Sequence, residues 1–170
     1  IALSGYAFPS VSNAPTTPGT HEYWNTFTAG ATIAAGGFYT ICHPSAAAGI
    51  QASCDQTHRY LSNGDDGYCI AQGTERNPTI LDCIGTFLAD PGRAWNVCGS
   101  GSGMTTQNHH LLRDTATCYG DATGAAFSGT TLSPCPWSET PYGTSVATWT
   151  HTGSCAPSPP PPPPPPPAPS

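Results

Sequence analysis

Short apolar runs alternate with clusters of turn residues along most of the chain. Runs of β-branched and aromatic residues bounded by Gly, Pro, Asn or Asp are typical of β-strands. On this basis strands are predicted at residues 37–42, 67–72, 79–85, 94–98, 110–113 and 146–151. Their spacing, with turns between them, indicates an all-β chain folded as an antiparallel β-sandwich.

Helical pattern is weak. Only residues 45–56 favour a helix, and Gly49 inside this alanine-rich segment limits it to two or three turns. Residues 63–67 (NGDDG) are a strong turn signal that leads into the strand at 67–72. The expected core consists of large apolar residues: Trp24, Phe27, Phe38, Ile41, Ile70, Ile80, Ile84, Trp95, Leu111 and Trp149.

Charge is scarce. Charged residues make up 8% of the chain, there is no lysine, and the net charge is −6. Phosphate binding depends on clustered Lys and Arg, so nucleic acid is not an expected partner. No apolar run approaches 18 residues, and membrane insertion is therefore not expected either.

Eight cysteines are spread along the chain and never form CxxC, at Cys42, Cys54, Cys69, Cys83, Cys98, Cys118, Cys135 and Cys155. This even number predicts four disulfides and an oxidising, extracellular setting. Zinc is the competing interpretation, but its ligands come in close pairs, so no metal site is predicted. Eight cysteines allow 105 connectivities. Three pairings are candidates, one across consecutive strands and two closing loops: Cys69–Cys83, Cys42–Cys54 and Cys118–Cys135.

The C-terminal segment contains nine consecutive prolines at residues 159–167. Such a run has no N–H groups and a fixed φ, so we expect a polyproline II rod of about 28 Å. It could serve as a stiff spacer, a ligand for aromatic grooves or a scaffold for sugars, or link the head to another domain. Two regions are predicted, a disulfide-bonded head at 1–155 and a proline-rich tail at 156–170. Because the chain starts at Ile1 without a signal peptide, we expect a mature or partial product.

With so few charges, solubility is expected to come from attached glycan. N-linked sugar is not expected, because Asn77 precedes a proline and Asn96-Val-Cys is only the rare cysteine sequon. Hydroxylation and O-glycosylation are therefore predicted on the tail. The candidate residues are Pro157, Ser158, Pro159, Pro160, Pro161, Pro162, Pro163, Pro164, Pro165, Pro166, Pro167, Pro169 and Ser170.

An ordered set of motifs occurs at residues 3–6, 35–41, 63–68, 80–85, 91–95, 106–113 and 137–152. This set resembles the lamin-tail domain over about residues 1–153. The resemblance implies an immunoglobulin-like β-sandwich, a hairpin turn at NGDDG, and no catalytic role for Arg113. The family usually has one or two strands before the first motif, and this chain starts at that motif. An unpaired sheet edge is therefore expected, to be completed by upstream sequence or by another chain. The lamin-tail domain does not generally contain eight cysteines, so this chain departs from the family there.

Few residues of the sequence are candidates for metal binding or catalysis. Asp65 and Asp66 could hold calcium, but calcium needs six or more oxygens, and a structural turn is the preferred interpretation. His109 and His110 beside Arg113 could suggest acid–base chemistry, although only one of the two histidines shares a strand face with Arg113. Residues 100–103 (SGSG) are not GxSxG, and no other catalytic or nucleotide-binding motif is present. No catalytic residue and no cofactor are predicted, and covalent O-glycans are the only attached groups expected.

Two functional hypotheses result. The first is a structural extracellular glycoprotein that self-associates into a surface or matrix filament or a cell wall. The tail supports it, because Ser-Pro before a proline run resembles the hydroxyproline-rich glycoproteins of plants and green algae. The second is an accessory binding module of a secreted hydrolase or nuclease, joined by a proline linker. An autonomous enzyme is the least favoured.

Overall fold

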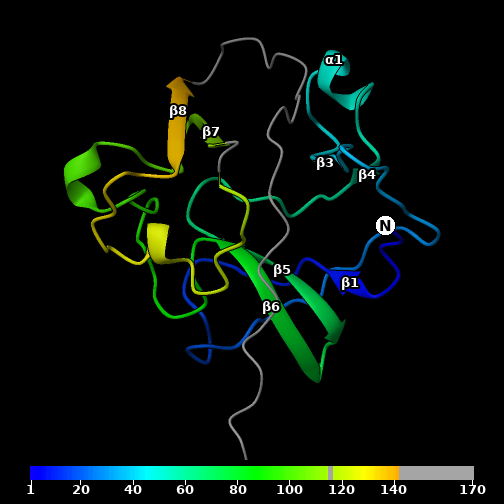
Figure 1. Cartoon of the computed structure of the whole chain (residues 1–170), viewed down its shortest axis with the longest axis horizontal. Helices are drawn as coiled ribbons and strands as arrows, with labels where there is room; N and C mark the ends of the chain where they lie inside the picture. Colours follow the sequence, from blue (N-terminus) through cyan, green and yellow to red (C-terminus); the bar gives the residue numbers. More distant parts are fainter. Residues whose placement is uncertain (115–116, 142–170) are drawn as a thin grey trace, which may run out of the picture.

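Short β-strands dominate this computed structural model, which describes residues 1–114 and 117–141 (Figure 1). The strands are β1 (Tyr6–Ala7), β2 (Ser10–Val11), β3 (Ile41–Cys42), β4 (Gln56–Thr57), β5 (Gly67–Thr74), β6 (Asn77–Ile84), β7 (His109–Arg113) and β8 (Trp137–Pro141). Helical structure within these two ranges is limited to α1 (Ala48–Gln51) and the 3-10 turns η1 (Ser100–Ser102) and η2 (Ala125–Phe127). The predicted all-β class is confirmed. The expected strand at 146–151, Trp149 and the tail lie outside the described residues.

The β5–β6 hairpin is the centre of the largest sheet. The two strands pair antiparallel from Thr74 opposite Asn77 to Tyr68 opposite Ile84. The short strands β1 and β2 pair antiparallel with β5, so that β5 lies between them and β6. Alternate β5 residues face the core because successive side chains of a strand point to opposite sides.

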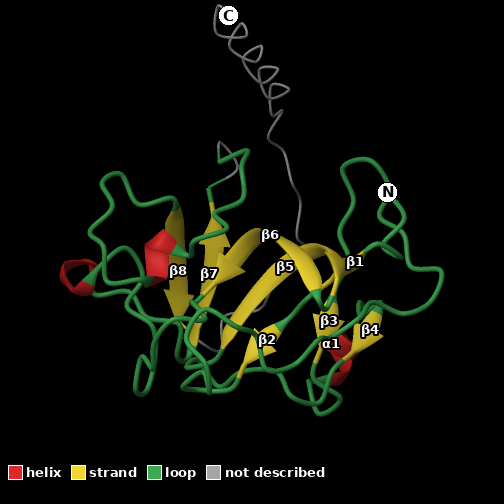
Figure 2. Ribbon diagram, turned by 90° about the horizontal axis from the view of Figure 1, so that it is seen from below, coloured by secondary structure: helices red, strands yellow, loops and turns green. Residues whose placement is uncertain are grey.

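Two smaller sheets flank this hairpin. β3 and β4 pair in parallel, and the Cys42–Cys54 disulfide closes the segment that carries α1. β7 and β8 form an antiparallel pair. In both views the β3–β4 pair with α1 and the β7–β8 pair lie on opposite sides of β5–β6 (Figures 1 and 2).

Among the described residues, the buried core forms two clusters. One joins Trp95, Val97, Cys98, Ala126 and Phe127, with Leu111 and Trp137 packed against it. The other joins Val11, Cys69, Cys83 and Phe87, with Ile80 beside it.

Three expected core residues are instead exposed: Phe38 at 48%, Ile70 at 38% and Ile84 at 43%. Cys69, Ala71 and Cys83 occupy the inward positions of the hairpin. Strand alternation therefore forces Ile70 and Ile84 outward, and the prediction that they belong to the core was wrong.

The NGDDG segment is not a hairpin turn. It comes after β4, which pairs with β3, and it enters β5, which pairs with β1, β2 and β6, so β4 and β5 do not form a ladder. The turn itself is held by the Ser62 hydroxyl, which accepts from the backbone N–H groups of Gly64 and Asp66 at 2.8 and 3.0 Å. The strand expected at 94–98 is reduced to a single bridge between Asn96 and Thr105.

The described residues contain three disulfides, Cys42–Cys54, Cys69–Cys83 and Cys98–Cys135. The first two confirm the pairings predicted from the sequence. The expected Cys118–Cys135 bond is wrong, because Cys135 reaches Cys98 in the Trp95 cluster instead. Cys118 is also disulfide-bonded. Disulfides at this density are typical of an oxidising, secreted setting.

The expected unpaired edge beside the first motif is occupied. The N–H groups of Leu3, Phe8 and Ser10 donate to the carbonyls of Ala31, Asn25 and Tyr23 at 2.8 to 3.0 Å. The segment that covers β1 and β2 is thus supplied by the chain itself, from residues 22–33, in the position where a leading strand was expected. On the far edge of the sheet, the N–H of Cys83 donates to the carbonyl of Asp121 at 2.9 Å. No helix in the described part of the chain is long and apolar enough to cross a membrane.

Candidate functional site

Four residues form a row across the outer face of the central sheet. Tyr23 bridges to Ser10, Ser10 is the register partner of Tyr68 in β5, and Tyr68 is the partner of Ile84 in β6. Side chains directly opposite each other in antiparallel pairs project to the same face. Ser10 is small and 5% exposed, so it forms a low floor between two tyrosines.

A cleft of about 380 Å³ opens over this floor, within the size range of small-ligand sites. Its lining is mainly apolar and comprises Ser10, Val11, Ser12, Tyr23, Asn25, His58, Tyr60, Asp66 and Tyr68. We call it the aromatic cleft. It was not predicted from the sequence, because Tyr23 meets the rings of residues 58–68 only through the pairing of Ser10 with both Tyr23 and Tyr68.

Hydrogen bonds hold the walls of the aromatic cleft. The Tyr68 hydroxyl donates to the carbonyl of Tyr60, which ties the loop after β4 to β5. The Trp95 indole N–H donates to the Asp66 carbonyl at 3.0 Å, from the side of the buried Trp95 cluster. The Asn25 amide donates to Ser10 Oγ at 3.0 Å. The cleft is therefore built on backbone that other parts of the fold hold in place.

A series of aromatic ring contacts runs from Tyr39 to His58 and Tyr60, which line the cleft. Ring centroids lie 5.3 Å apart from Tyr39 to Phe27, 5.2 Å from Phe27 to Phe8, 5.4 Å from Phe8 to His58 and 6.0 Å from His58 to Tyr60. Tilted and edge-to-face contacts at these distances are favourable. The exposed Tyr60 ring is thus the outer end of a packed stack.

Burial favours the uncharged form of two aromatic side chains of the cleft, Tyr68 and His58. Burial, with the nearby Asp66 carboxylate as a second cause, raises the pKa of Tyr68 to about 12. Burial also lowers the pKa of His58, which favours the neutral imidazole. Among the described residues that line the cleft, Asp66 is the one that carries a charge.

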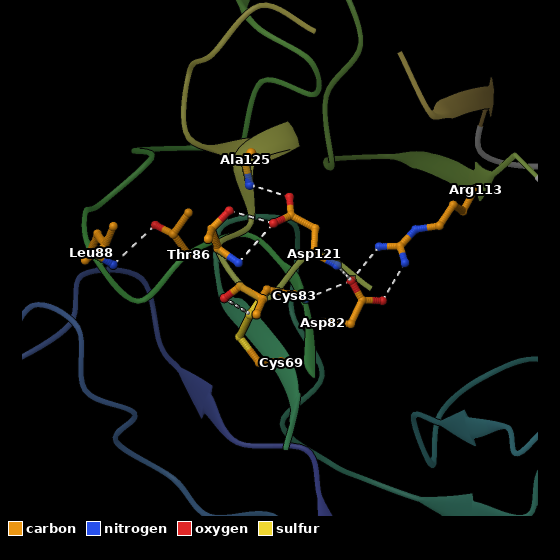
Figure 3. Close-up of a disulfide and its surroundings, with 10 residues drawn as sticks. Cys69, Asp82, Cys83, Thr86, Leu88, Arg113, Asp121 and Ala125 are labelled. Carbon is orange, nitrogen blue, oxygen red and sulfur yellow. Dashed lines mark hydrogen bonds and ion pairs between the residues drawn. A yellow bond between two sulfur atoms is a disulfide. The ribbon is translucent and has the colours of Figure 1, made fainter. Parts of the chain in front are cut away.

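A second group of polar residues lies on the outer edge of β6 (Figure 3). Arg113 Nη1 and Nη2 contact the two Asp82 carboxylate oxygens at 2.6 and 2.8 Å. Asp82 also accepts from the backbone N–H of Asp121 at 2.7 Å, and the Arg113 guanidinium lies 4.6 Å from the centre of the Trp137 ring. Arg113 therefore links β7 to β6, and Asp82 links β6 to the loop that contains Asp121.

Asp121 organises that loop. Burial alone would raise the pKa of Asp121, but hydrogen bonds from the Thr123 hydroxyl and from the backbone of Thr123, Ala125 and Ala126 outweigh it, and the net pKa is lowered. Thr123 Oγ1 and the Ala125 N–H both lie 2.6 Å from the carboxylate.

The two carboxylates of NGDDG occupy different environments. Asp65 is 8% exposed, and its Oδ1 accepts no hydrogen bond from the described residues. Asp66 lines the cleft and accepts from the Asn13 N–H at 3.0 Å. Within residues 1–114 and 117–141, no cluster of three or more His, Cys, Asp or Glu side chains could hold a metal ion.

His109 and Arg113 lie on one face of β7 and His110 on the other. His109 Nδ1 lies 3.6 Å from Glu139 Oε2 in β8 and 3.4 Å from Thr105 Oγ1. Both contacts join β7 to neighbouring segments. Ser102, which ends the η1 turn within the SGSG segment, donates its hydroxyl to the carbonyls of Val97 and Gly99.

Comparison of the chain with family models, curated proteins and solved structures finds no match. The aromatic cleft is therefore interpreted from its own geometry. One sequence signal could have pointed to it: His58 and Tyr60 stand just before NGDDG and Tyr68 just after it, so the turn gathers three rings.

Proposed function

We propose that this chain is a structural extracellular glycoprotein, a subunit of a surface or matrix filament or a cell-wall assembly. The observation that carries the proposal is that one chain combines two parts: a β head with few charges that is cross-linked by disulfides, and a run of nine prolines. The head contributes stability, because each disulfide reduces the conformational entropy of the unfolded chain. The tail contributes a stiff rod that hydroxylation and O-glycosylation would make soluble.

The head is proposed to be an immunoglobulin-like sandwich of the lamin-tail type. Supporting this, the first motif runs into β1, NGDDG leads into β5, residues 80–84 complete β6, and residues 106–113 contain β7. Antiparallel pairing of β1, β2 and β6 with β5 agrees with such a sheet. The small flanking sheets and residues 22–33 beside β1 are where this chain departs from a regular sandwich.

The second candidate function is an accessory binding module of a secreted hydrolase or nuclease. The aromatic cleft favours it, since tyrosine-lined concavities bind ligands in many proteins. The two proposals differ in the sequence expected beyond the tail. A catalytic domain encoded after Ser170 favours the module, and further heads or further proline favour the structural subunit.

Mass spectrometry of the native protein tests the first proposal. We expect an intact mass well above the 17.5 kDa of the bare chain, with hydroxyproline and glycan in tail peptides. Electron microscopy of the same material should show filaments or sheets. Unmodified prolines in native tail peptides together with monodisperse single particles would overturn it.

A further inference from the structure

We propose that the aromatic cleft binds the proline run, residues 159–167, of a second copy of this chain. The inference rests on the proposed function as a self-assembling subunit and identifies the contact that would join one subunit to the next. It assigns the cleft a ligand of defined chemistry, an uncharged polyproline II rod.

The donors and acceptors of cleft and rod are complementary. A proline run has carbonyl acceptors and no N–H donors, so its binding site must supply the donors. The hydroxyls of Tyr23 and Tyr60 make no hydrogen bond to any other described residue, and these side chains are 55% and 75% exposed. Grooves that recognise polyproline II combine flat aromatic rings with such donors.

The spacing of the cleft also fits the rod. Tyr23 and Tyr68 lie one strand to either side of Ser10, and two strand spacings are about 9.5 Å. One turn of polyproline II rises about 9.3 Å in three residues. A rod lying across the strands would therefore place prolines i and i+3 against Tyr23 and Tyr68, over the Ser10 floor. Ile84 continues the same row, so the apolar track extends beyond Tyr68.

Charge does not oppose this contact. The tail has no charged side chain, burial raises the pKa of Tyr68 and so favours its neutral phenol, and burial lowers the pKa of His58 and so favours its neutral imidazole. The Asp66 carboxylate already accepts from the Asn13 N–H. Binding is thus expected to depend little on salt.

Proline modification restricts which part of the rod can bind. A polyproline II rod has three faces, and a cleft of about 380 Å³ has room for one of them without attached sugar. The bound face must stay bare, and glycans would occupy the two faces that point to solvent.

The first test is peptide binding to a full-length receptor. The receptor carries Pro161→Gly, Pro163→Gly and Pro165→Gly, so that its own tail cannot form the rod. The probe is a labelled, unmodified peptide of residues 156–170, followed by fluorescence anisotropy. We expect saturable binding that weakens about tenfold or more with Tyr60→Ala or Tyr23→Ala. Tyr119→Ala, an equally exposed tyrosine outside the cleft, is the matched control and should leave affinity unchanged.

Circular dichroism of each variant will check that the substitution leaves the protein folded. No binding to the receptor, or binding that both cleft substitutions leave intact, overturns the proposal.

The second test asks whether the occupant comes from another copy. A cleft variant (Tyr23→Ala with Tyr60→Ala) keeps its tail, and the tail-substituted receptor keeps its cleft. Each should be monomeric alone by sedimentation velocity, and an equimolar mixture should give a 1:1 complex. If the peptide binds the receptor but the mixture stays monomeric, the cleft takes its own tail and the second-copy occupant is overturned.

Failure of this inference is distinguishable from failure of the proposed function. Filaments that still form with Tyr23→Ala and Tyr60→Ala would remove the cleft contact and leave the structural role standing. If the peptide binds in a cleft-dependent way but the native protein carries no glycan and forms no filament, the structural role is overturned and the cleft contact stands.

Discussion

At the scale of single residues, stability depends on a few carboxylates that each satisfy several donors. Asp82 and Asp121 do so on the outer edge of β6, and Glu22 does so near the chain start, where it accepts from Thr16 and Ser12. In a chain with only ten acidic residues, each such carboxylate organises a whole loop.

Asp82→Ala should lower the free energy of unfolding by about 2–3 kcal/mol. The substitution removes hydrogen bonds to a charged group and leaves the Arg113 guanidinium and the Asp121 N–H without their acceptor. Denaturant titration of the unreduced protein measures the change. Glu75→Ala, at an exposed turn residue, is the control and should change stability by less than about 0.5 kcal/mol. An equal effect of the two substitutions would contradict a structural role for Asp82.

Acid should weaken the fold partly through Asp121. Its pKa is lowered in the folded state, so the unfolded chain binds the proton more tightly. The stabilisation is therefore complete above the ordinary aspartate pKa of about 3.9 and is lost as the pH falls through the lower folded value. Melting temperatures of the wild type and Asp121→Asn should differ at pH 7 and converge near pH 2. A difference that stays constant with pH would show that the charge of Asp121 contributes nothing.

At the scale of elements, the long β5–β6 hairpin positions most of the molecule. Its inner face carries the Cys69–Cys83 disulfide, and its outer face carries Tyr68 of the aromatic cleft. The turn after β6 brings Trp95 against the hairpin, and Trp95 in turn holds Asp66. Changes at the ends of this hairpin should therefore affect both core clusters.

Gly85→Ala should be more destabilising than Gly92→Ala. Both glycines have positive φ, 76° and 79°, so both variants lose about 1–2 kcal/mol from backbone strain. At Gly85 a Cβ would also lie 2.7 Å from the Trp95 indole nitrogen, whereas at Gly92 it would meet open space. The extra crowding should add about 1–3 kcal/mol, measured by thermal or denaturant unfolding. Equal losses at the two sites would mean that Trp95 moves aside freely.

The two disulfides on the cores should contribute unequally. Removing Cys98–Cys135, with a separation of 37 residues, should cost about 4 kcal/mol, and removing Cys69–Cys83, with a separation of 14, about 3 kcal/mol. Paired Cys→Ala variants and denaturant titration compare them. A larger loss at Cys69–Cys83 would show that the hairpin ladder needs its disulfide more than chain entropy predicts.

Element type was more predictable than element partner. Residues 67–72 and 79–84 form strands because their alternation and turn signals act locally. The parallel β3–β4 pair, the Cys98–Cys135 bond and the meeting of Tyr23 with the rings around NGDDG depend on contacts between separate segments, and local pattern does not identify those partners. Ile70 and Ile84 were wrongly assigned to the core because their size suggested burial. The strand register instead turns the smaller residues Cys69, Ala71 and Cys83 inward, so that the neighbouring isoleucines face outward.

At the scale of the whole molecule, the chain compensates for scarce charge and short strands by covalent closure. The described disulfides hold the β3–β4 segment, the central hairpin and the Trp95 cluster in turn. We expect all eight cysteines to be oxidised. Alkylation of the unreduced protein followed by mass spectrometry should therefore add no label, and four or more labelled thiols would contradict this prediction.

The ring closed by Cys42–Cys54 has a further consequence. Its helix, Ala48–Gln51, has no buried residue, and the disulfide fixes both ends of the segment whatever lies between them. Sequence inside the ring is therefore insulated from the core and free to diverge or to be exchanged. An epitope inserted there would sit on a rigid base, at a site where antibodies or gold labels could mark each subunit of the proposed assembly.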